Sequence, residues 1–238
     1  MKPAIKNNTK SKDPSKRTFY DRDKLLMELL PLFFIILMFG IAFYAYPHLP
    51  PKIPTHWNAS GQADGFNEKN SVFFIPILFL ILCILFFILP IMEVFRDNML
   101  KIYKYYYWFK IFFGLFFLVL FIATLLPNFG YDINVAYIVI SMICVLFIGL
   151  GFVLPKLKRN FMFGIRTGWT LSSDKVWDET HKIGGALFIF VGVITIILSL
   201  LLRLEVLFFA FIGLVLSVSL FLVFYSYHLY KNDMSTKK

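Results

Sequence analysis

The chain consists of six long apolar runs separated by polar connections. Each run has about 20 residues, the length an α-helix needs to cross the hydrocarbon core of a bilayer. The runs are continuous and lack the alternation of apolar and polar positions that marks a barrel strand, so no β-barrel is expected. We therefore predict six transmembrane helices, at residues 26–46, 72–92, 107–126, 135–154, 184–202 and 206–229.

These runs predict an all-α, polytopic integral membrane protein with both termini on one side of the membrane. The first run is too long for the apolar core of a cleaved signal peptide, so we expect it to remain as a helix. The segments expected are a basic, disordered tail (1–24), a two-helix module (25–95) with a proline-rich loop (47–70), a four-helix module (96–230) with a polar loop (155–182), and a second tail (231–238).

Composition supports a membrane environment. The chain is 59% apolar and 16% charged, and it contains 30 phenylalanines, more than one soluble core of this size would bury. Its two cysteines, Cys83 and Cys144, both fall inside apolar runs. They are expected to be buried apolar side chains and not a disulfide framework.

The distribution of the +10 net charge predicts the orientation. Twenty Lys and Arg residues lie in the two tails and in loops 93–104 and 155–182, against three in the connections on the other face. By the positive-inside rule, both termini and loop 155–182 are expected in the cytoplasm of a bacterial or archaeal cell. The charge is thereby assigned to topology, and no direct nucleic-acid binding is expected. Lys110 should reach the inner interface by snorkelling, beside an aromatic belt at 105–108.

Loop 47–70, on the outer face, has too much specific chemistry for a plain linker. Its prolines prevent helix continuation, and Gly61 and Asp64 begin or form tight turns. A metal site at His56, Asp64 and Glu68 is one interpretation, but the spacing matches no known ligand pattern. The alternative is that His56 and Trp57 pack at the headgroup level and Asp64 caps a turn. Candidate binding residues in this loop are Pro54, His56, Trp57 and Asp64.

The outer loop also carries a recognisable pattern, Leu49-Pro50-x-x-Ile53-Pro54-x-His56-Trp57-x-x-x-Gly61-x-x-Asp64-Gly65-x-x-x-Lys69. This pattern resembles a small bacterial membrane module of unknown function, formed by a helix, this loop and a second helix. The resemblance implies that an immunity-protein module follows it in the chain.

Loop 155–182, on the inner face, begins after a basic stop that ends the fourth helix. Ser172 or Ser173 is expected to cap a helix that starts near Asp174 and continues into the fifth span. Four-residue spacing on that helix places Asp174 beside Asp178, and Trp177 beside His181.

Three interpretations of this loop remain open from the residues alone. Asp178 and His181 could act as an enzyme's base and its orienting partner, although no nucleophile motif accompanies them. Two tryptophans and an arginine are also typical of a binding surface. In a purely structural interpretation, Arg166 pairs with Asp174 or Asp178 and the tryptophans anchor the interface.

The loop carries the ordered pattern Lys158-Arg159-Asn160-Phe161-x-x-Gly164-Ile165-Arg166-Thr167-x-Trp169-Thr170-Leu171-Ser172-Ser173-Asp174-x-x-Trp177-x-x-Thr180-His181-Lys182-x-Gly184-Gly185. This pattern closely resembles the signature of the SdpI immunity family, bacterial membrane proteins linked to resistance against a secreted sporulation-delaying toxin. One departure is Gly168, which stands where the family pattern has proline. The resemblance implies binding roles for a set of residues in the loop: Asn160, Gly164, Arg166, Trp169, Asp174, Trp177 and His181.

The resemblance implies a membrane immunity protein that binds a toxin peptide and protects the membrane potential. It also implies toxin sensing, in which the inner face captures a soluble cytoplasmic repressor. The alternatives are a small transporter or efflux protein, disfavoured by the scarcity of charges inside the spans, and a membrane enzyme using the acid–histidine pair. We expect no enzyme activity, no cofactor and no metal; the expected partners are the lipid bilayer, a toxin peptide and a cytoplasmic repressor.

Overall fold

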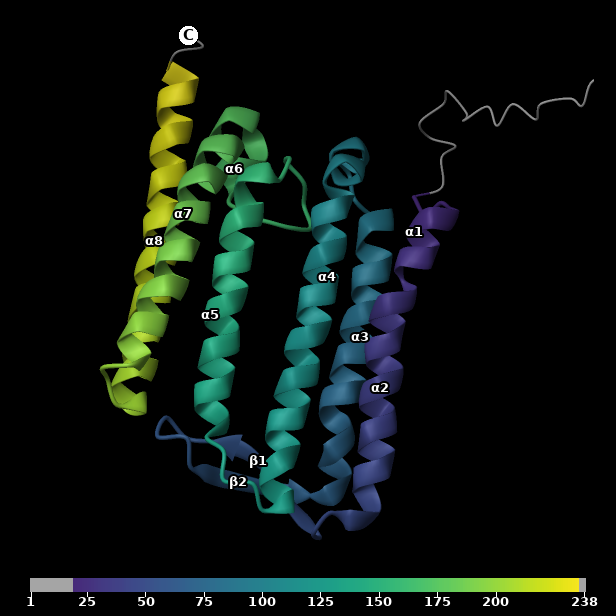
Figure 1. Ribbon diagram of the computed structural model, residues 1–238. Helices are drawn as coiled ribbons and strands as arrows, with labels where there is room; N and C mark the ends of the chain where they lie inside the picture. The colour runs from purple at the N-terminus through teal and green to yellow at the C-terminus, as the bar shows by residue number, and fades with distance from the viewer. Residues whose placement is uncertain (1–18, 236–238) are drawn as a thin grey trace, which may run out of the picture.

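The structure is a computed structural model that describes residues 19–235. Most of the predicted disordered tail (1–24) therefore lies outside the described residues. Within them, six helical stretches are long and apolar enough to cross a membrane (Figure 1). The predicted spans are confirmed as helices, and their bounds are Arg22–His48, Lys69–Ile91, Arg96–Phe129, Val135–Lys156, Asp174–Ser199 and Leu204–Ser235.

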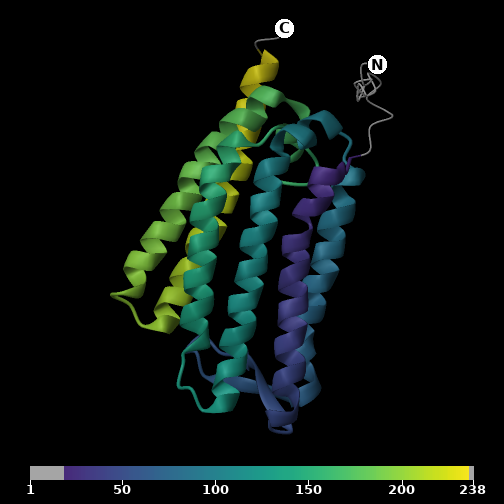
Figure 2. The same ribbon diagram turned by 45° about the vertical axis from the view of Figure 1, so that its right-hand side comes forward.

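The helices form two groups that meet where α4 packs on α5 (Figures 1 and 2). The first group holds α1 (Arg22–Met27), α2 (Leu29–Ala45), α3 (Phe74–Ile88) and α4 (Arg96–Leu125). The second holds α5 (Val135–Val153), α7 (Asp174–Ser199) and α8 (Leu204–Ser235), with the short α6 (Gly168–Ser172) at one end. Several helices end in single 3-10 turns, at Tyr46–His48, Leu89–Ile91, Leu126–Phe129 and Leu154–Lys156.

The apolar core of the first group lies between α2, α3 and α4. Met38 and Ala42 of α2 are fully buried there, and Phe79 stacks on Phe117 with ring centroids 5.4 Å apart. Large apolar side chains on the outer surfaces of the same helices remain exposed, among them Phe33, Ile36 and Phe43. This inside-out distribution suits helices that are surrounded by lipid.

Close backbone approach joins α5 to α7. A Cβ added at Gly185 would lie 2.6 Å from the Gly151 carbonyl oxygen, and one added at Gly151 would lie 2.6 Å from that of Gly185. Since apolar side chains gain little by leaving lipid for a helix interface, this kind of van der Waals packing between small residues is a main source of helix association in membranes.

The connection between α2 and α3 contains two short strands, which the sequence analysis did not predict. β1 (Lys52–Trp57) pairs antiparallel with β2 (Ala63–Glu68), and Ile53 lies opposite Asn67. Gly61 adopts φ +79° in the turn between them, a value that favours glycine. The hairpin crosses one end of the bundle, below α4 and α5 in Figure 1. Hydropathy missed it because no apolar run marks these strands.

The start of α4 and the start of α7 both lie within segments predicted as loops. α4 begins at Arg96, so most of the predicted loop 93–104 is helical. The predicted capping of α7 is confirmed, because the Ser173 side chain accepts a hydrogen bond from the Val176 N–H. The predicted aromatic belt is split: Tyr106 is buried and donates to the Phe86 carbonyl, whereas Trp108 is exposed.

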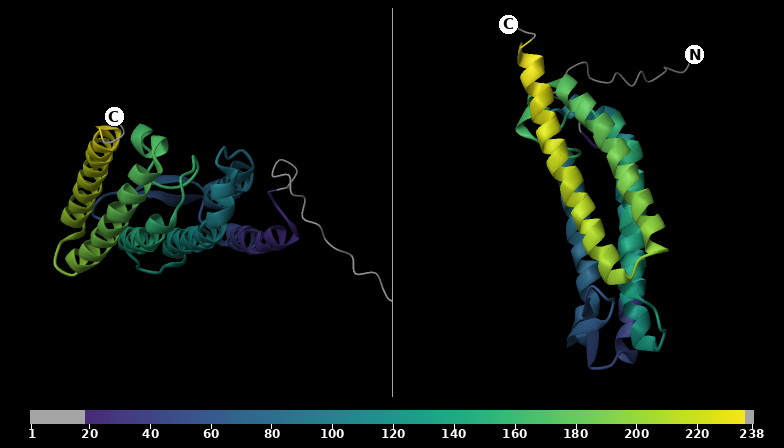
Figure 3. Two further views of the ribbon diagram at one scale, coloured as in Figure 1. Left: turned by 90° about the horizontal axis from the view of Figure 1, so that it is seen from above. Right: turned by 90° about the vertical axis from the view of Figure 1, so that its left-hand side faces the viewer.

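The beginning of α1 and the end of α8 lie at the same end of the bundle, together with α6 (Figures 1 and 3). We call this the α6 end, and we call the opposite end, where β1 and β2 lie, the hairpin end. α8 runs beside α7 at the edge of the bundle from one end to the other (Figure 3).

Candidate functional site

The connection between α5 and α7 folds into a defined structure at the α6 end. Its centre is Asn160, which has no solvent exposure. The Asn160 Oδ1 accepts hydrogen bonds from the N–H groups of Met162 and Phe163, at 2.8 and 2.6 Å. Its Nδ2 donates to the carbonyls of Lys158 and Phe163, at 2.8 and 2.9 Å. One side chain thus satisfies four backbone groups of a segment that forms no regular structure.

Trp177 and His181 form the second part of this buried cluster. The two rings stack with centroids 4.0 Å apart, and both residues are fully buried. The Trp177 Nε1 donates to the Leu157 carbonyl at 3.0 Å, which ties α7 to the end of α5. Gly164 adopts φ +124°, and a Cβ there would collide with the His181 ring. Trp177 and His181, predicted as neighbours on this helix, are therefore in contact, and they hold the connection in place.

The hydrogen bonds of His181 define its protonation. Its Nδ1 lies 2.8 Å from the Trp177 carbonyl, which can only accept, so Nδ1 carries the proton. Its Nε2 lies 2.9 Å from the Ile165 nitrogen, whose N–H can only donate, so Nε2 accepts. The ring is therefore neutral, and both of its nitrogens are engaged by backbone groups.

The acidic residues of the α5–α7 connection pair with basic residues other than Arg166. Asp174 pairs with Arg159, at 2.8 Å from Nε, and Asp178 lies 3.7 Å from the Lys158 Nζ. Arg166 donates to the Phe161 carbonyl and pairs with neither acid, so that structural prediction is wrong. The acid–histidine pair of the enzyme interpretation is also not formed, because His181 bonds to backbone groups only. The basic stop Lys158–Arg159, and not Arg166, neutralises the first turns of α7.

Glu93 is a residue of this site that sequence reasoning treated as a charge at a helix end. It is 5% exposed, and its carboxylate accepts hydrogen bonds from the N–H groups of Phe95 and Phe161. The Phe95 and Phe161 rings stack at 5.3 Å, and Arg159 covers Phe95 at 4.8 Å. Glu93 thereby joins the two helical groups at the α6 end. No local pattern marks the link to the second group, because Phe161 is 68 residues away in the sequence.

The predicted binding residues in the connection between α5 and α7, and in the first turns of α7, thus separate into two sets. Asn160, Gly164, Trp177 and His181 are the buried cluster and are not available to a partner in this conformation. Arg166 and Asp174 are exposed, and Trp169 is partly exposed. We call the second set the exposed face; its residues are Arg166, Trp169 and Asp174.

The exposed face is connected to α8. The Trp169 ring contacts Tyr227 with centroids 5.2 Å apart, and the Thr167 hydroxyl lies 3.2 Å from that of Ser226. The Ser173 hydroxyl donates to the buried Asp233 carboxylate at 3.0 Å. The last turns of α8 therefore fix the position of α6 and the start of α7.

At the hairpin end, His56 and Asp64 form a pair across the two strands, with Nδ1 and Oδ1 2.5 Å apart. Both side chains are largely exposed. Asp64 thus pairs with His56. The interpretation in which Asp64 caps a turn is wrong. Among residues 19–235, no group of three or more His, Cys, Asp and Glu side chains is placed to hold a metal ion.

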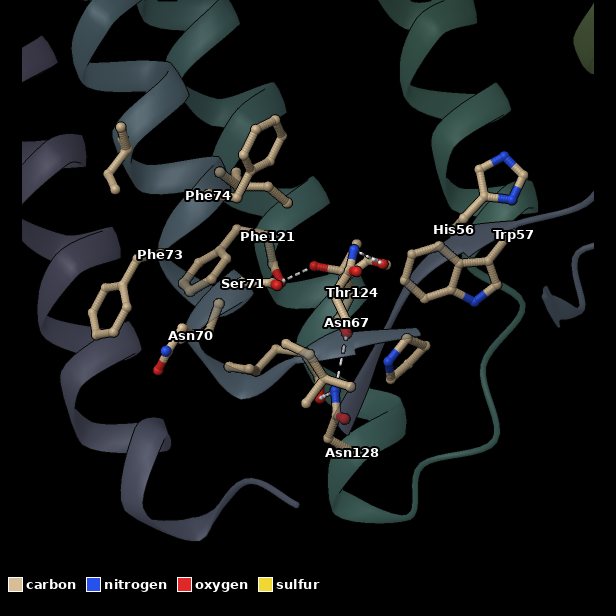
Figure 4. A pocket seen from close by; sticks show the side chains of 17 residues that line it. His56, Trp57, Asn67, Asn70, Ser71, Phe73, Phe74, Phe121, Thr124 and Asn128 are labelled. Atoms are coloured by element: carbon tan, nitrogen blue, oxygen red, sulfur yellow. Dashed lines mark hydrogen bonds between the residues drawn. The ribbon is translucent and has the colours of Figure 1, made fainter. Parts of the chain in front are cut away.

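Pro54 and Trp57 line a cavity of about 650 Å³ between the hairpin and the ends of α3 and α4 (Figure 4). The cavity walls are mainly apolar, with amide and hydroxyl groups from Asn67, Thr124 and Asn128. Typical ligand pockets have about 300–1,000 Å³ and the same mixture of apolar walls and a few polar groups. Sequence reasoning missed these three residues, because they come from two distant segments and belong to no motif.

The tip of the hairpin contacts the second helical group. The Ser60 hydroxyl donates to the Glu205 carboxylate at the start of α8. Gly61 lies against the Asn134 side chain, which caps α5. The first module therefore covers part of the second at the hairpin end.

A buried ion pair lies between α4 and the junction of α1 and α2. Lys110 contacts the Glu28 carboxylate, which also accepts a hydrogen bond from the Tyr103 hydroxyl at 3.0 Å. The Lys110 side chain is 3% exposed, so the prediction that it snorkels to the interface is wrong. Charge pairing within the bundle replaces contact with the headgroups.

Comparison with known proteins adds three findings. Residues 156–226 match the SdpI/YfhL protein family, and residues 33–80 match a domain of unknown function, DUF1648. The chain is 25% identical over 203 residues to Immunity protein SdpI of Bacillus subtilis (strain 168), an alignment that covers 85% of this chain and 95% of that protein. No solved structure matches the chain. The resemblance seen in the two motifs is thereby confirmed.

Proposed function

We propose that this SdpI-type membrane protein confers immunity to a secreted toxic peptide. The observation that carries the proposal is the alignment to Immunity protein SdpI, which covers 95% of that protein. It extends over nearly all of this chain, whereas the match to the SdpI/YfhL family is confined to residues 156–226. The likeness therefore concerns the whole membrane unit and not one shared helix.

The proposed orientation places the α6 end in the cytoplasm and the hairpin end outside. Among residues 19–235, twelve Lys and Arg residues lie at the α6 end, whereas Lys52, Lys69 and Arg203 lie in the connections at the hairpin end. The positive-inside rule favours this arrangement. A secreted peptide would then meet the hairpin and its cavity first.

Survival of a toxin-sensitive Gram-positive host tests the immunity function. Cells expressing the full chain are exposed to the mature sporulation-delaying toxin peptide, with empty-vector cells and Arg166→Ala cells matched for membrane abundance. Wild-type protection above the vector supports immunity, and loss of protection in Arg166→Ala would assign the exposed face to the mechanism. Wild-type cells that die like the vector control at full abundance would refute immunity to this toxin.

A second function, toxin sensing by capture of a cytoplasmic repressor, is favoured by the contacts of α8. This helix has 32 residues and a length of about 48 Å. Its start contacts the hairpin through Glu205, and its end holds α6 and the start of α7 through Ser226 and Asp233. A displacement of the hairpin would thus reach the exposed face through one continuous element.

Charge reversal on the exposed face separates the two functions. In a host that carries a repressor-controlled reporter gene, Arg166→Glu is expected to abolish the toxin-induced reporter signal while survival is retained. Lys182→Glu, on an exposed α7 position outside the exposed face, is the matched control. Equal reporter induction in the wild type and Arg166→Glu would refute capture at this face.

A further inference from the structure

An apolar groove lies between α4 and α5, where the two helical groups meet (Figures 1 and 2). Its volume is about 230 Å³, and seven residues line it: Trp108, Phe109 and Phe112 of α4, and Leu146, Gly149, Leu150 and Val153 of α5. From the first to the last of its α5 residues the groove follows the helix for about 10 Å. The Trp108 indole N–H is the only polar side-chain group in this set, and a buried polar group without a partner is costly. The part of a ligand that enters the groove is therefore hydrocarbon.

Gly149 opens the groove on the α5 side. It is exposed, and a Cβ added there would meet no heavy atom within 4 Å. In contrast, the missing Cβ of Gly151 permits the close approach of α5 to α7. The space beside Gly149 is thus not filled by the described part of the chain, and it faces the surroundings of the bundle.

Two lysines stand where the groove approaches the α6 end. Lys104 precedes Trp108 by four residues, so it lies on the same face of α4, one turn nearer the α6 end. Lys156 follows Val153 by three residues in the 3-10 turn that ends α5, and its Nζ lies 5.6 Å from the centroid of the Tyr105 ring. Both lysines are exposed, and neither forms an ion pair with an acid among residues 19–235. The groove therefore ends at two cations that lack an anionic partner in this part of the chain.

Trp108 indicates the level of the lipid headgroups. Its side chain is 56% exposed at the junction between the apolar groove and the two lysines. Tryptophan is enriched at membrane–water interfaces, where its ring spans the apolar and polar regions. The groove thus lies at the depth of the acyl chains, and the lysines lie at the depth of the phosphates.

We propose that this groove is a specific site for an anionic phospholipid, with one acyl chain along α4 and α5 and the phosphate between Lys104 and Lys156. Basic pockets between transmembrane helices bind anionic lipid headgroups in this way. The site depends neither on the immunity function proposed above nor on which end of the bundle is cytoplasmic.

Other occupants fit the groove less well. An extended peptide would bring backbone N–H and C=O groups into a groove that offers them no partner. A second copy of the chain would insert with the same orientation, so its own basic end would lie at the level of Lys104 and Lys156 and repel them. Charge complementarity at the end of the groove therefore favours an anionic lipid.

The test measures lipid binding to the purified full chain in detergent by native mass spectrometry. The probes are phosphatidylglycerol and phosphatidylcholine with identical acyl chains. The wild type is expected to bind phosphatidylglycerol at least about tenfold more tightly, because each lysine near an anionic headgroup adds to the affinity. Lys104→Gln combined with Lys156→Gln should reduce this preference below about twofold. Lys182→Gln combined with Lys231→Gln, at exposed positions of α7 and α8 outside the groove, is the matched control and should keep the preference.

Gly149→Leu tests the acyl-chain part of the site. Its side chain would displace two or more methylenes from the groove, so binding of both lipids should weaken about fivefold or more. Gly213→Leu is the matched control, because Gly213 of α8 is equally open and does not line the groove; it should change the affinities less than about twofold.

Equal affinities of the wild type for the two lipids would reduce the site to ordinary contact with the bilayer and overturn the proposal. A preference for phosphatidylglycerol that survives in the Lys104→Gln, Lys156→Gln variant would place the anionic site elsewhere, with the same consequence. A dimer that Gly149→Leu dissociates without loss of lipid affinity would identify a second copy as the occupant. Because both lysines are exposed, their double variant is expected to fold, and its preference decides the proposal even if Gly149→Leu does not fold.

Discussion

Asn160→Ala tests whether Asn160, in the connection between α5 and α7, has a structural role or a recognition role. Asn160 is fully buried and makes four hydrogen bonds of 2.6–2.9 Å to backbone groups. A hydrogen bond contributes about 1 kcal/mol net, and a buried polar group left without a partner costs about 1–3 kcal/mol. Because Met162 and Phe163 are only partly buried, water can reach some of the released groups. The expected loss of stability is therefore about 2–4 kcal/mol.

The assay is thermal unfolding of the purified full chain in nanodiscs. For a chain of this size, about 1 kcal/mol corresponds to about 2–4 °C, so the expected decrease in Tm is about 4–16 °C. Asn98→Ala is the matched control, because the Asn98 Nδ2 makes one hydrogen bond, to the Arg159 carbonyl at 2.9 Å. Its expected effect is about 0.5–1.5 kcal/mol.

Equal Tm decreases in the two variants would refute the assignment of Asn160 as the centre of the buried cluster. A wild-type Tm in Asn160→Ala together with loss of immunity would place Asn160 in recognition, as the family resemblance implies. The measurement therefore separates two roles that the sequence does not distinguish.

Three further substitutions test other parts of the structure by the same unfolding assay. Gly164→Ala should destabilise by more than about 1 kcal/mol, because φ +124° is strained for alanine and its Cβ would collide with His181; an unchanged Tm would contradict this geometry. Gly168→Pro should stabilise the protein by about 0.4–1 kcal/mol. Gly168 is the first residue of α6, Thr167 before it is extended (φ −110°, ψ 163°), and the space around Gly168 is open, so proline fits there. A lower Tm in Gly168→Pro would contradict this reasoning. Lys110→Ala should destabilise the protein by about 3 kcal/mol, because it leaves the Glu28 carboxylate without its cation. Lys110→Met combined with Glu28→Gln should recover much of this loss. Equal Tm values for the wild type and Lys110→Ala would refute a stabilising ion pair between Lys110 and Glu28.

The sequence predicts the six helices well because bilayer thickness imposes one simple requirement, a long apolar run. It predicts α4 less well. The first turns of α4 contain Arg96, Lys101 and Lys104, so hydropathy ends the run there although the helix continues into the polar region. The hairpin is missed for a related reason: its strands are short, polar and exposed, and they are defined by pairing and by Gly61 in the turn, neither of which is a hydropathy signal.

Local spacing predicts contacts within one helix and fails for contacts between segments. The neighbouring positions of Trp177 and His181 follow from four-residue spacing and are confirmed; the stacking of their rings is an additional finding. The partner of Asp174 is Arg159, which lies on a segment whose path is defined by the bonds of Asn160 and Glu93 and not by spacing. The cavity is the extreme case, since its walls come from both strands of the hairpin, the turn before α3 and the ends of two helices.

The residues of the SdpI-like signature divide into the buried cluster and the exposed face, and this division changes how the signature should be interpreted. A signature residue such as Trp177 binds backbone groups of its own chain, so its constancy among relatives would be explained by folding alone. We therefore expect any recognition role to belong to the exposed face, whose residues the buried cluster holds in place. The cluster is also attached to α8, whose other end contacts the hairpin through Glu205. A ligand that displaces the hairpin would therefore move the exposed face as one preformed unit. Ser60→Ala removes the hydrogen bond between the hairpin and α8, so it should reduce toxin-induced signalling while leaving the Tm of the full chain unchanged.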